Sequence, residues 1–245
     1  RRAGCVYCKV NNGSGEMSEK GRWNGLPLVI FGSGGISREV AKLVEDINRN
    51  SPSKVFDLLG FVEKDASHIG ESVQNTKIIS SDDLFQEFAK HFGCLGVVIP
   101  QGVPNIKTRI YNKLMEHQAR NLVFPNLIHP TVDTENIRLE ICIGNIISKN
   151  SLISIDVKIG NFNLINANVN IGHDVVIGDF CVINSLTMIA GSVEICNGVT
   201  IGAGSSIYQG LKIGKDAVVG MGSSVITNVP EKTTAMGVPA TSVRI

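Results

Sequence analysis

The sequence predicts a small parallel α/β unit followed by a parallel β-helix, and two patterns lead to this fold class. β-branched aliphatic residues recur at every sixth position from Ile141 to Val225 without a break. Between residues 26 and 125, short apolar runs alternate with segments of helical periodicity. A period of six fits neither an amphipathic helix nor a long strand, whereas it is typical of a hexapeptide β-helix. Strands that alternate with helices predict a parallel, Rossmann-like sheet.

The first α/β elements are a buried strand, a glycine turn and a helix. The apolar run at residues 28–31 is followed by Gly-Ser-Gly-Gly at residues 32–35 and by helical spacing over residues 36–44. Glycines let the backbone approach a ligand closely, and the free N–H groups of a helix start favour a phosphate. The third glycine of the dinucleotide fingerprint is missing, because Ser37 stands there. A tight turn that binds nothing is therefore the alternative.

The later α/β elements place further polar groups at strand ends. They are expected as a strand over residues 58–62, a helix start with capping residues over 80–85, a strand over 96–100, a helix over 105–116 and a strand over 122–124. Glu63 ends the second strand, where its carboxylate could meet a ribose or a base or could simply be solvated. In a parallel sheet the pocket lies at the carboxyl ends of the strands. We therefore expect residues 32–36, Glu63 and Gly102 to converge there.

The hexads predict the geometry of the second unit. If each hexad is a short strand plus a corner, three hexads make one triangular coil and each aliphatic lies above its counterpart eighteen residues earlier, giving about five coils. Stacked Ile and Val suit the interior, and Gly and Asn suit corners with unusual backbone angles. Residues 125–130 begin and end with proline and mark the boundary between a domain over 26–125 and one over 126–245. After Val225 we expect loops and an extended tail.

The N-terminal residues 1–25 are expected to be a poorly ordered extension. Cys5 and Cys8 form a Cys-x-x-Cys pair, which could be half of a zinc site or a redox pair. A second ligand pair with matching spacing is missing, so we predict no metal.

Composition excludes several classes of function. The chain has 245 residues, 43% of them hydrophobic, which suffices for one large or two ordinary domains. Its 23 basic and 22 acidic residues give a net charge of +1, so it has no electrostatic footprint for nucleic acid or for an anionic membrane. Its apolar runs are interrupted within a few residues, which predicts no membrane-spanning segment and no signal peptide. We expect a cytoplasmic protein.

An ordered set of motifs connects the chain to a known family. These are Gly-Ser-Gly-Gly at 32–35, Asn-Leu-Ile-His-Pro at 126–130, Gly-His-Asp at 172–174, Gly-Ala-Gly-Ser at 202–205 and Gly-Val-Pro-Ala at 237–240. Over about residues 26–245 the chain resembles the NeuD/PglD-like sugar O- and N-acyltransferases. The resemblance implies a left-handed β-helix, a nucleotide-sugar-binding α/β domain, a homotrimer, and acetyl-CoA bound in grooves between neighbouring helices. It also implies acetylation of a nucleotide-linked 4-amino sugar.

His173 is the candidate general base. Acetyl transfer from a thioester requires removal of a proton from the attacking amine or hydroxyl, and an imidazole is suited to that task. His173 is the only histidine in the repeats and lies two residues after the inward Ile171, so it should be near a corner and face outward. It matches the family's catalytic histidine, and Asp174 matches the acidic neighbour that orients it. A surface histidine without a role is the alternative.

Other site residues follow from the resemblance alone. Asn166 matches an asparagine near the base, although it could be an ordinary corner residue. Gly191 matches a glycine whose N–H faces the thioester carbonyl and could stabilise an oxyanion. The expected cofactor-binding residues are Gly191, Gly202, Ala203, Gly204 and Met221. The expected substrate-binding residues are Gly32, Gly34, Gly35, Ile36, Glu63 and Gly102.

The chain departs from the family at two positions. Val182 and Ile36 stand where many members have histidines, and these replacements bear on cofactor contacts and on sugar specificity. The rival hypotheses are a catalytically silent β-helix that serves as a scaffold or nucleotide-sugar-binding module, and another hexapeptide acyltransferase resembling serine acetyltransferase. The homotrimer is also supported by apolar residues expected to face outward on the prism. These are Val176, Phe180, Val182, Leu186 and Met188.

Overall fold

The computed structural model describes residues 24–116, 120–135 and 137–243. The predicted N-terminal extension, with Cys5 and Cys8, lies outside the described residues except for Asn24 and Gly25. In the described part of the chain, no helix is both long and apolar enough to span a membrane.

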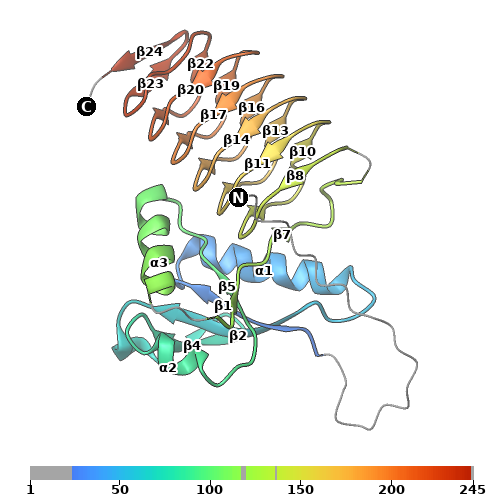
Figure 1. The fold of residues 1–245 in the computed structure, drawn as a ribbon, viewed down its shortest axis with the longest axis vertical. Coiled ribbons are helices and arrows are strands. Elements are labelled where there is room, and N and C mark those ends of the chain that lie inside the picture. Colours follow the sequence, from blue (N-terminus) through green and yellow to red (C-terminus); the bar gives the residue numbers. More distant parts are fainter. Residues whose placement is uncertain (1–23, 117–119, 136, 244–245) are drawn as a thin grey trace.

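The N-terminal unit is a three-layer α/β domain built on a six-stranded sheet of order β3-β4-β2-β1-β5-β6 (Figure 1). Its strands are β1 (Leu26–Phe31), β2 (Phe56–Glu63), β3 (Ser72–Val73), β4 (Thr76–Ser81), β5 (Leu95–Val98) and β6 (Leu122–Val123). Its helices are α1 (Gly35–Arg49), the 3₁₀ helix η1 (Ala66–His68), α2 (Phe85–Ala89) and α3 (Pro104–Glu116). All neighbouring strands are parallel except β3 and β4. Alternate β1 side chains pack against α1 on one face and against α2 and α3 on the other.

One expected helix start differs from the structure. The sequence predicts a helix start with capping residues over 80–85, but Ser80 and Ser81 complete β4, a strand that is not predicted from the sequence. The α2 helix begins only at Phe85, and no side chain caps it. Pairing with β2 therefore overrides the local capping preference of these serines.

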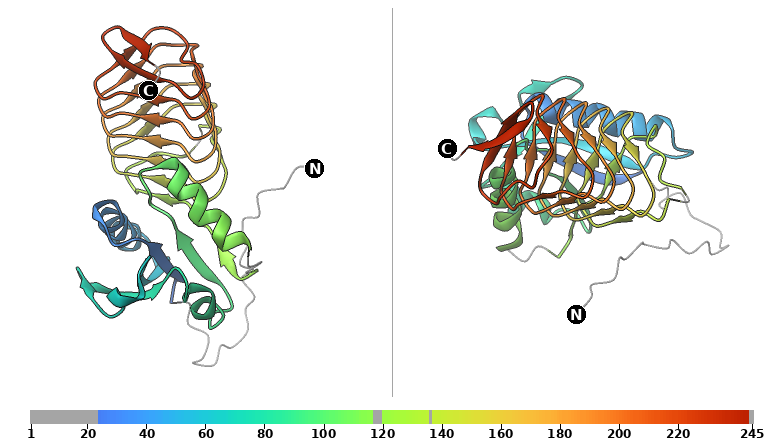
Figure 2. Two further views of the ribbon diagram at one scale, coloured as in Figure 1. Left: turned by 90° about the vertical axis from the view of Figure 1, so that its left-hand side faces the viewer. Right: turned by 90° about the horizontal axis from the view of Figure 1, so that it is seen from above.

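The second unit is a left-handed parallel β-helix whose coils stack along one axis (Figures 1 and 2). The first face comprises β10 (Leu152–Ile153), β13 (Asn170–Ile171), β16 (Met188–Ile189), β19 (Ser206–Ile207) and β22 (Ser224–Val225). The second face comprises β8 (Glu140–Ile141), β11 (Lys158–Ile159), β14 (Val176–Ile177), β17 (Glu194–Ile195) and β20 (Lys212–Ile213). The third face comprises β7 (Leu127–Ile128), β9 (Ile146–Ile147), β12 (Leu164–Ile165), β15 (Val182–Ile183), β18 (Thr200–Ile201), β21 (Val218–Val219), β23 (Thr234–Gly237) and β24 (Ala240–Val243).

The six-residue prediction is confirmed residue by residue. Strands pair eighteen residues apart, so that Ile153, for example, lies beside Ile171. The predicted aliphatics fill one continuous core, to which Cys181 also belongs. The corners repeat with the same period, because every sixth residue from Gly144 to Gly222 has a positive φ. Asp and Asn occupy many of these left-handed positions, as expected, but the bulky Phe and Leu side chains at 162, 180 and 186 do so too.

The chain after Val225 was expected to form loops and a tail, and this is wrong for two segments. β23 pairs in parallel with β21 and turns back into β24, with which it forms an antiparallel hairpin. The hairpin extends the third face beyond the last hexad and gives the main-chain groups of β21 a partner.

The α/β domain covers the third face through α1. Outward-facing Ile146, Leu164 and Val182 of this face share one buried cluster with Val40 and Val44 of α1. Val182 is only 1% exposed. Its predicted place in an exposed apolar patch is therefore wrong: it does point away from the prism interior, but α1 covers it.

The α3 helix docks on the corner where the chain passes from the second face to the third, here called the second corner. The rings of Phe162 and Phe180 stack there with centroids 5.3 Å apart. Tyr111 of α3 packs against both rings, and Phe124 meets Phe162 edge to face. The prediction that Phe180 lies in an exposed patch is thus also wrong, because the aromatic contact with α3 shields it.

A buried lysine completes this interface. Lys107 of α3 is 1% exposed, and its ammonium group donates a hydrogen bond of 2.8 Å to the main-chain carbonyl of Phe162. Among the described residues no carboxylate forms an ion pair with it. Burial therefore lowers the pKa of Lys107 from its ordinary value of 10.5 to about 7.

We predict a pH-dependent contribution of Lys107 to stability. Between pH 7 and 10.5 the unfolded chain holds a proton on this amine that the folded protein lacks, so raising the pH stabilises the fold across this window. Below a pH of about 7 the folded protein holds the proton as well, and the free-energy cost of burying the charged amine is present in full. In Lys107→Met, the free energy of unfolding should rise less with pH over this window than in the wild type. The difference in slope should approach about 1.4 kcal/mol per pH unit.

Chemical denaturation at a series of pH values measures this slope. Lys113→Met is the matched control, because Lys113 lies on the same helix but is exposed and paired with Asp83. Parallel curves for the wild type and Lys107→Met would contradict the assignment.

Candidate functional site

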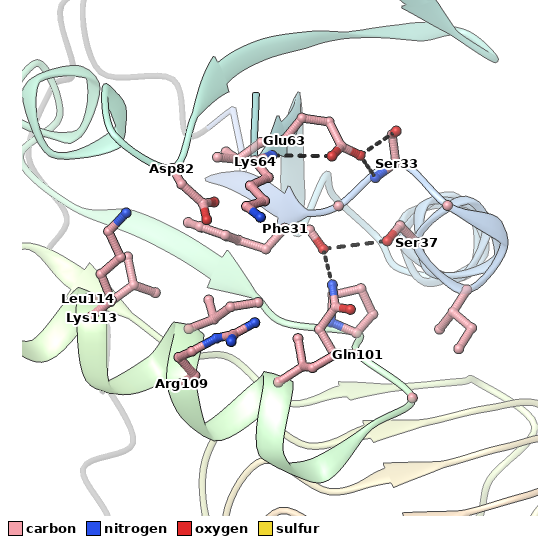
Figure 3. Close-up of a pocket in the computed structure, with 18 of the residues that line it drawn as sticks. Phe31, Ser33, Ser37, Glu63, Lys64, Asp82, Gln101, Arg109, Lys113 and Leu114 are labelled. Carbon is pink, nitrogen blue, oxygen red and sulfur yellow. Dashed lines mark hydrogen bonds between the residues drawn. The ribbon is translucent and has the colours of Figure 1, made fainter. Parts of the chain in front are cut away.

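A cavity of about 640 Å³ opens at the carboxyl ends of the parallel strands of the α/β domain (Figure 3). The structure places all the expected substrate-binding residues around it: Gly32, Gly34, Gly35, Ile36, Glu63 and Gly102. Ile36 and Gly102 lie against each other, since a Cβ on Gly102 would come within 3.0 Å of the Ile36 Cδ1 atom. The glycine turn and the loop before α3 thus form one continuous wall.

The glycines of the turn serve different purposes. Gly32 has a φ of +87°, and a Cβ there would lie 3.0 Å from the Gln101 amide nitrogen, so the fold itself favours glycine at this position. A Cβ on Gly34 or Gly35 would meet nothing within 4 Å. Neither residue has a left-handed φ. The protein's own packing therefore does not require these two glycines, although glycine is a favourable N-cap residue at position 34.

The start of α1 faces the cavity without a cap. Gly34 is the N-cap residue, and no side chain bonds to the N–H groups of the first turn. The first turn of any helix has N–H groups without partners in the helix and carries a partial positive charge. Because Gly34, Gly35 and Ile36 line the cavity, this part of its wall suits an anion.

Glu63 is held in place by the turn. Its Oε1 atom accepts a hydrogen bond of 2.6 Å from the Ser33 N–H and a second one from the Ser33 hydroxyl. The carboxylate therefore forms the wall next to the glycines, with Oε2 turned to the main chain of Lys64 at 3.2 Å.

Several charged residues of the cavity were not predicted from the sequence: Lys64, Asp82, Arg109 and Lys113. Asp82 follows β4, a strand that is not predicted from the sequence, and its N–H donates a hydrogen bond to the Glu63 carbonyl. Burial raises the pKa of the Asp82 carboxyl, and the charge of Lys113 opposes this shift. Arg109 and Lys113 are four residues apart on α3, so their common face could have been found from helical periodicity.

A second group of predicted residues lies on the β-helix, where the chain passes from the first face to the second. At this first corner the His173 Nδ1 atom lies 2.8 Å from the Asp174 Oδ2 atom. Asp174 has a φ of +59°, one of the periodic left-handed positions. If the carboxylate accepts the Nδ1 proton, the Nε2 atom of a neutral imidazole carries a free lone pair. The His173 side chain is 61% exposed, so this lone pair is accessible.

Gly191 lies on the next coil directly against the imidazole. A Cβ on Gly191 would come within 2.6 Å of both Cε1 and Nε2 of His173. The glycine therefore makes room for the ring. In the described part of the chain, no acceptor takes the Gly191 N–H, so this donor is available to a ligand.

The other predicted residues lie at a different corner. Asn166, Gly202, Ala203, Gly204 and Met221 belong to the third corner, where the chain passes from the third face to the first. Asn166 donates to the Asn184 side chain at 3.1 Å, and Met221 is 78% exposed. Within one chain, the structure does not bring these residues to His173. The first face separates the two corners.

Val182 has no access to a ligand, because α1 buries it. Within the described ranges, no cluster of three or more His, Cys, Asp or Glu side chains could hold a metal ion. The chemically distinctive groups are thus an imidazole paired with a carboxylate on the β-helix and a mixed-charge cavity in the α/β domain.

Comparison with known proteins identifies the repeats and the fold. Residues 175–209 match the family model described as bacterial transferase hexapeptide (six repeats). A search of curated proteins found no match.

Solved structures resemble nearly the whole chain. A mutant of perosamine N-acetyltransferase from Caulobacter crescentus, in complex with CoA and GDP-perosamine, has 21% identity and a TM-score of 0.78, covering 89% of this chain and 96% of the other. The acetyltransferase domain of PglB from Neisseria gonorrhoeae, in complex with acetyl coenzyme A, has 20% identity and a TM-score of 0.76, covering 89% and 100%. WeeI from Acinetobacter baumannii has 23% identity and a TM-score of 0.74, also covering 89% and 100%. The chain therefore carries bacterial transferase hexapeptide repeats and has the fold of these acetyltransferases.

Proposed function

We propose that the protein is an acetyl-CoA-dependent acetyltransferase that acts on a nucleotide-linked amino sugar. The observation that carries this proposal is the His173–Asp174 pair at the first corner, with the imidazole packed against Gly191. A base and a hydrogen-bond donor at one point are what acyl transfer from a thioester needs. The similar folds solved with CoA or acetyl coenzyme A support the choice of acyl donor.

In the proposed mechanism the acetyl group passes directly from donor to acceptor. The amine attacks the thioester carbonyl while the His173 Nε2 atom removes its proton, and the Gly191 N–H stabilises the oxyanion of the tetrahedral intermediate. The intermediate then collapses, the bond to sulfur breaks, and His173 returns the proton to the CoA thiolate. Asp174 orients the imidazole and stabilises its protonated form.

The cavity of the α/β domain is the proposed acceptor site. Its volume of about 640 Å³ suits a ligand of nucleotide size. Gly34 and Gly35 leave open space at the uncapped start of α1, where phosphate groups would bind. Glu63 would accept hydrogen bonds from a ribose.

The active assembly is proposed to be a homotrimer that packs through the first face. This face is neither covered by the α/β domain nor charged: it exposes Leu152 and Met188, which are 56% and 47% exposed. The second face, in contrast, carries the ion pairs Lys158–Glu140 and Lys212–Glu194. Packing of the first face against a neighbouring copy would bring the first corner of one subunit near the third corner of the next. The residues that one chain separates, His173 and Asn166, would then share one groove.

We predict that Met188→Glu disrupts this assembly. A charge in the centre of an apolar interface is strongly unfavourable, so the variant should be a monomer without activity that keeps its secondary structure. Light scattering and circular dichroism measure both properties. Val176→Glu is the matched control, because Val176 is similarly exposed, at 42%, but lies on the charged second face. A trimeric Met188→Glu, or a wild type that is monomeric, would refute the assembly.

We predict that His173→Ala lowers acetyl transfer by about 10²–10⁴-fold, the usual contribution of a general base. Thermal stability should stay near that of the wild type, because the side chain is exposed. Thiol release from acetyl-CoA in the presence of UDP- and GDP-linked amino sugars measures turnover. His68→Ala serves as the control, since His68 is an exposed histidine that also pairs with a carboxylate, that of Glu71. Full turnover by His173→Ala would exclude the base and favour the silent-scaffold alternative.

We predict that Gly34→Val raises the KM of the acceptor far more than that of acetyl-CoA. The new side chain would meet no protein atom within 4 Å at its Cβ, so the fold should persist while the cavity loses space beside the α1 start. Gly93→Val is the control, because a Cβ there is equally unobstructed and Gly93 lies outside the cavity. Equal effects on the KM of both substrates would show that the cavity is not the acceptor site.

A further inference from the structure

The α3 helix contacts the β-helix with one face and lines the cavity with another. One face docks on the β-helix through Lys107 and Tyr111. The other lines the cavity with Ile106, Arg109 and Lys113. Because the docked face is held by both a buried hydrogen bond and aromatic packing, the cavity face keeps a fixed position relative to the β-helix.

Arg109 is a cation without a partner at this wall. Its guanidinium group projects from α3 toward the interior of the cavity (Figure 3). In the described part of the chain its side chain forms no hydrogen bond or ion pair, whereas Lys113 on the next turn is bound to Asp83 at 2.9 Å. Arg109 therefore has no direct acidic partner among the described residues.

The wall formed by the glycine turn is also electropositive. The uncapped first turn of α1 directs its partial positive charge into the same cavity, next to Gly34 and Gly35. Ser33 donates two hydrogen bonds to the Oε1 atom of Glu63 and holds this carboxylate at the glycine turn, and among the described residues Glu63 forms no ion pair with Arg109. Two positive elements therefore border a space that the protein leaves empty of side chains.

We propose that Arg109 binds the phosphate groups of the acceptor from α3, opposite the start of α1. The guanidinium fork is planar and binds two phosphate oxygens at once, which suits a diphosphate better than a lysine would. Arg109 then determines specificity: it selects sugars carried on a nucleoside diphosphate over unphosphorylated sugars. This inference rests on the proposed function, since it assigns a residue within the proposed acceptor site.

The docking of α3 on the β-helix means that the contact between Arg109 and a diphosphate would also position the acceptor. Because Lys107 and Tyr111 fix α3 on the β-helix, a diphosphate held by Arg109 is fixed relative to the β-helix as well. Arg109 would thus position the acceptor as well as bind it, although it touches no reacting atom.

Calorimetric titration of the whole 245-residue chain with UDP, GDP and dTDP tests the proposal, when each diphosphate is compared with its own nucleoside. The wild type should bind at least one diphosphate more tightly than the matched nucleoside. Arg109→Gln should lower the affinity for that diphosphate by about 10- to 100-fold and leave the affinity for the nucleoside unchanged, because only the charge-assisted hydrogen bonds to phosphate are lost. Arg109→Lys should recover part of the loss. Lys90→Gln, which removes an exposed cation that is paired with Glu87 and lies outside the cavity, should stay within about twofold of the wild type.

The remaining outcomes separate the inference from the function on which it rests. Equal diphosphate binding by the wild type and Arg109→Gln would overturn the role of Arg109 and leave the acceptor site standing. A loss of CoA affinity in Arg109→Gln, with diphosphates unaffected, would overturn it as well, since the phosphates contacted would be those of the coenzyme. A wild type that binds none of the three diphosphates would refute both the inference and the acceptor half of the proposed function.

Discussion

Main-chain pairing between residues eighteen apart is the constraint on which the rest of the structure depends. Each coil of the β-helix hydrogen-bonds to the next in the same register, and every sixth residue turns a corner with a positive φ. Corner residues of successive coils therefore lie directly above one another. For this reason the ring of His173 meets Gly191, eighteen residues later, and only a residue without a Cβ fits there. The geometry of the proposed base is a consequence of the repeat, and it does not need a specialised loop.

The α/β domain docks on a corner of the β-helix whose residues stack with the same regularity. The second corner stacks Phe162 on Phe180, and the left-handed backbone at both positions turns their rings outward against Tyr111. Lys107 then bonds to the Phe162 carbonyl. An isolated buried ammonium group is unfavourable, and this explains why the pKa of Lys107 falls to about 7 instead of the charge being kept. The interface is thus fixed by one hydrogen bond of defined direction within an apolar and aromatic contact, which gives α3 a single orientation above the cavity.

The repeated and the local features of the structure could be predicted from the sequence. The period of six predicts each core residue of the β-helix. The glycine turn and Glu63 predict the cavity wall, because the strand ends of a parallel sheet meet at one edge. Prediction from the sequence failed where distant segments decide the outcome. Val182 and Phe180 point away from the prism as the hexads require, but α1 and α3, from far earlier in the chain, cover them. Asp82 was missed because β4 has only a short apolar run. Arg109 was missed because a charge on a helix resembles any solvated residue until the cavity beside it is known.

The glycines distinguish what the fold requires from what a ligand requires. In the β-helix a Cβ on Gly172, Gly178 or Gly202 would collide with main-chain or side-chain atoms of the next coil, so stacking alone explains these residues. Gly34 and Gly35 meet no such obstacle, and their backbone angles suit other amino acids. Gly34 is the N-cap of α1, where glycine is favoured over alanine, whereas Gly35 gains no contact within the chain. We propose that the phosphate groups of the acceptor use this open space and the N–H groups at the start of α1, and that Arg109 holds them from across the cavity.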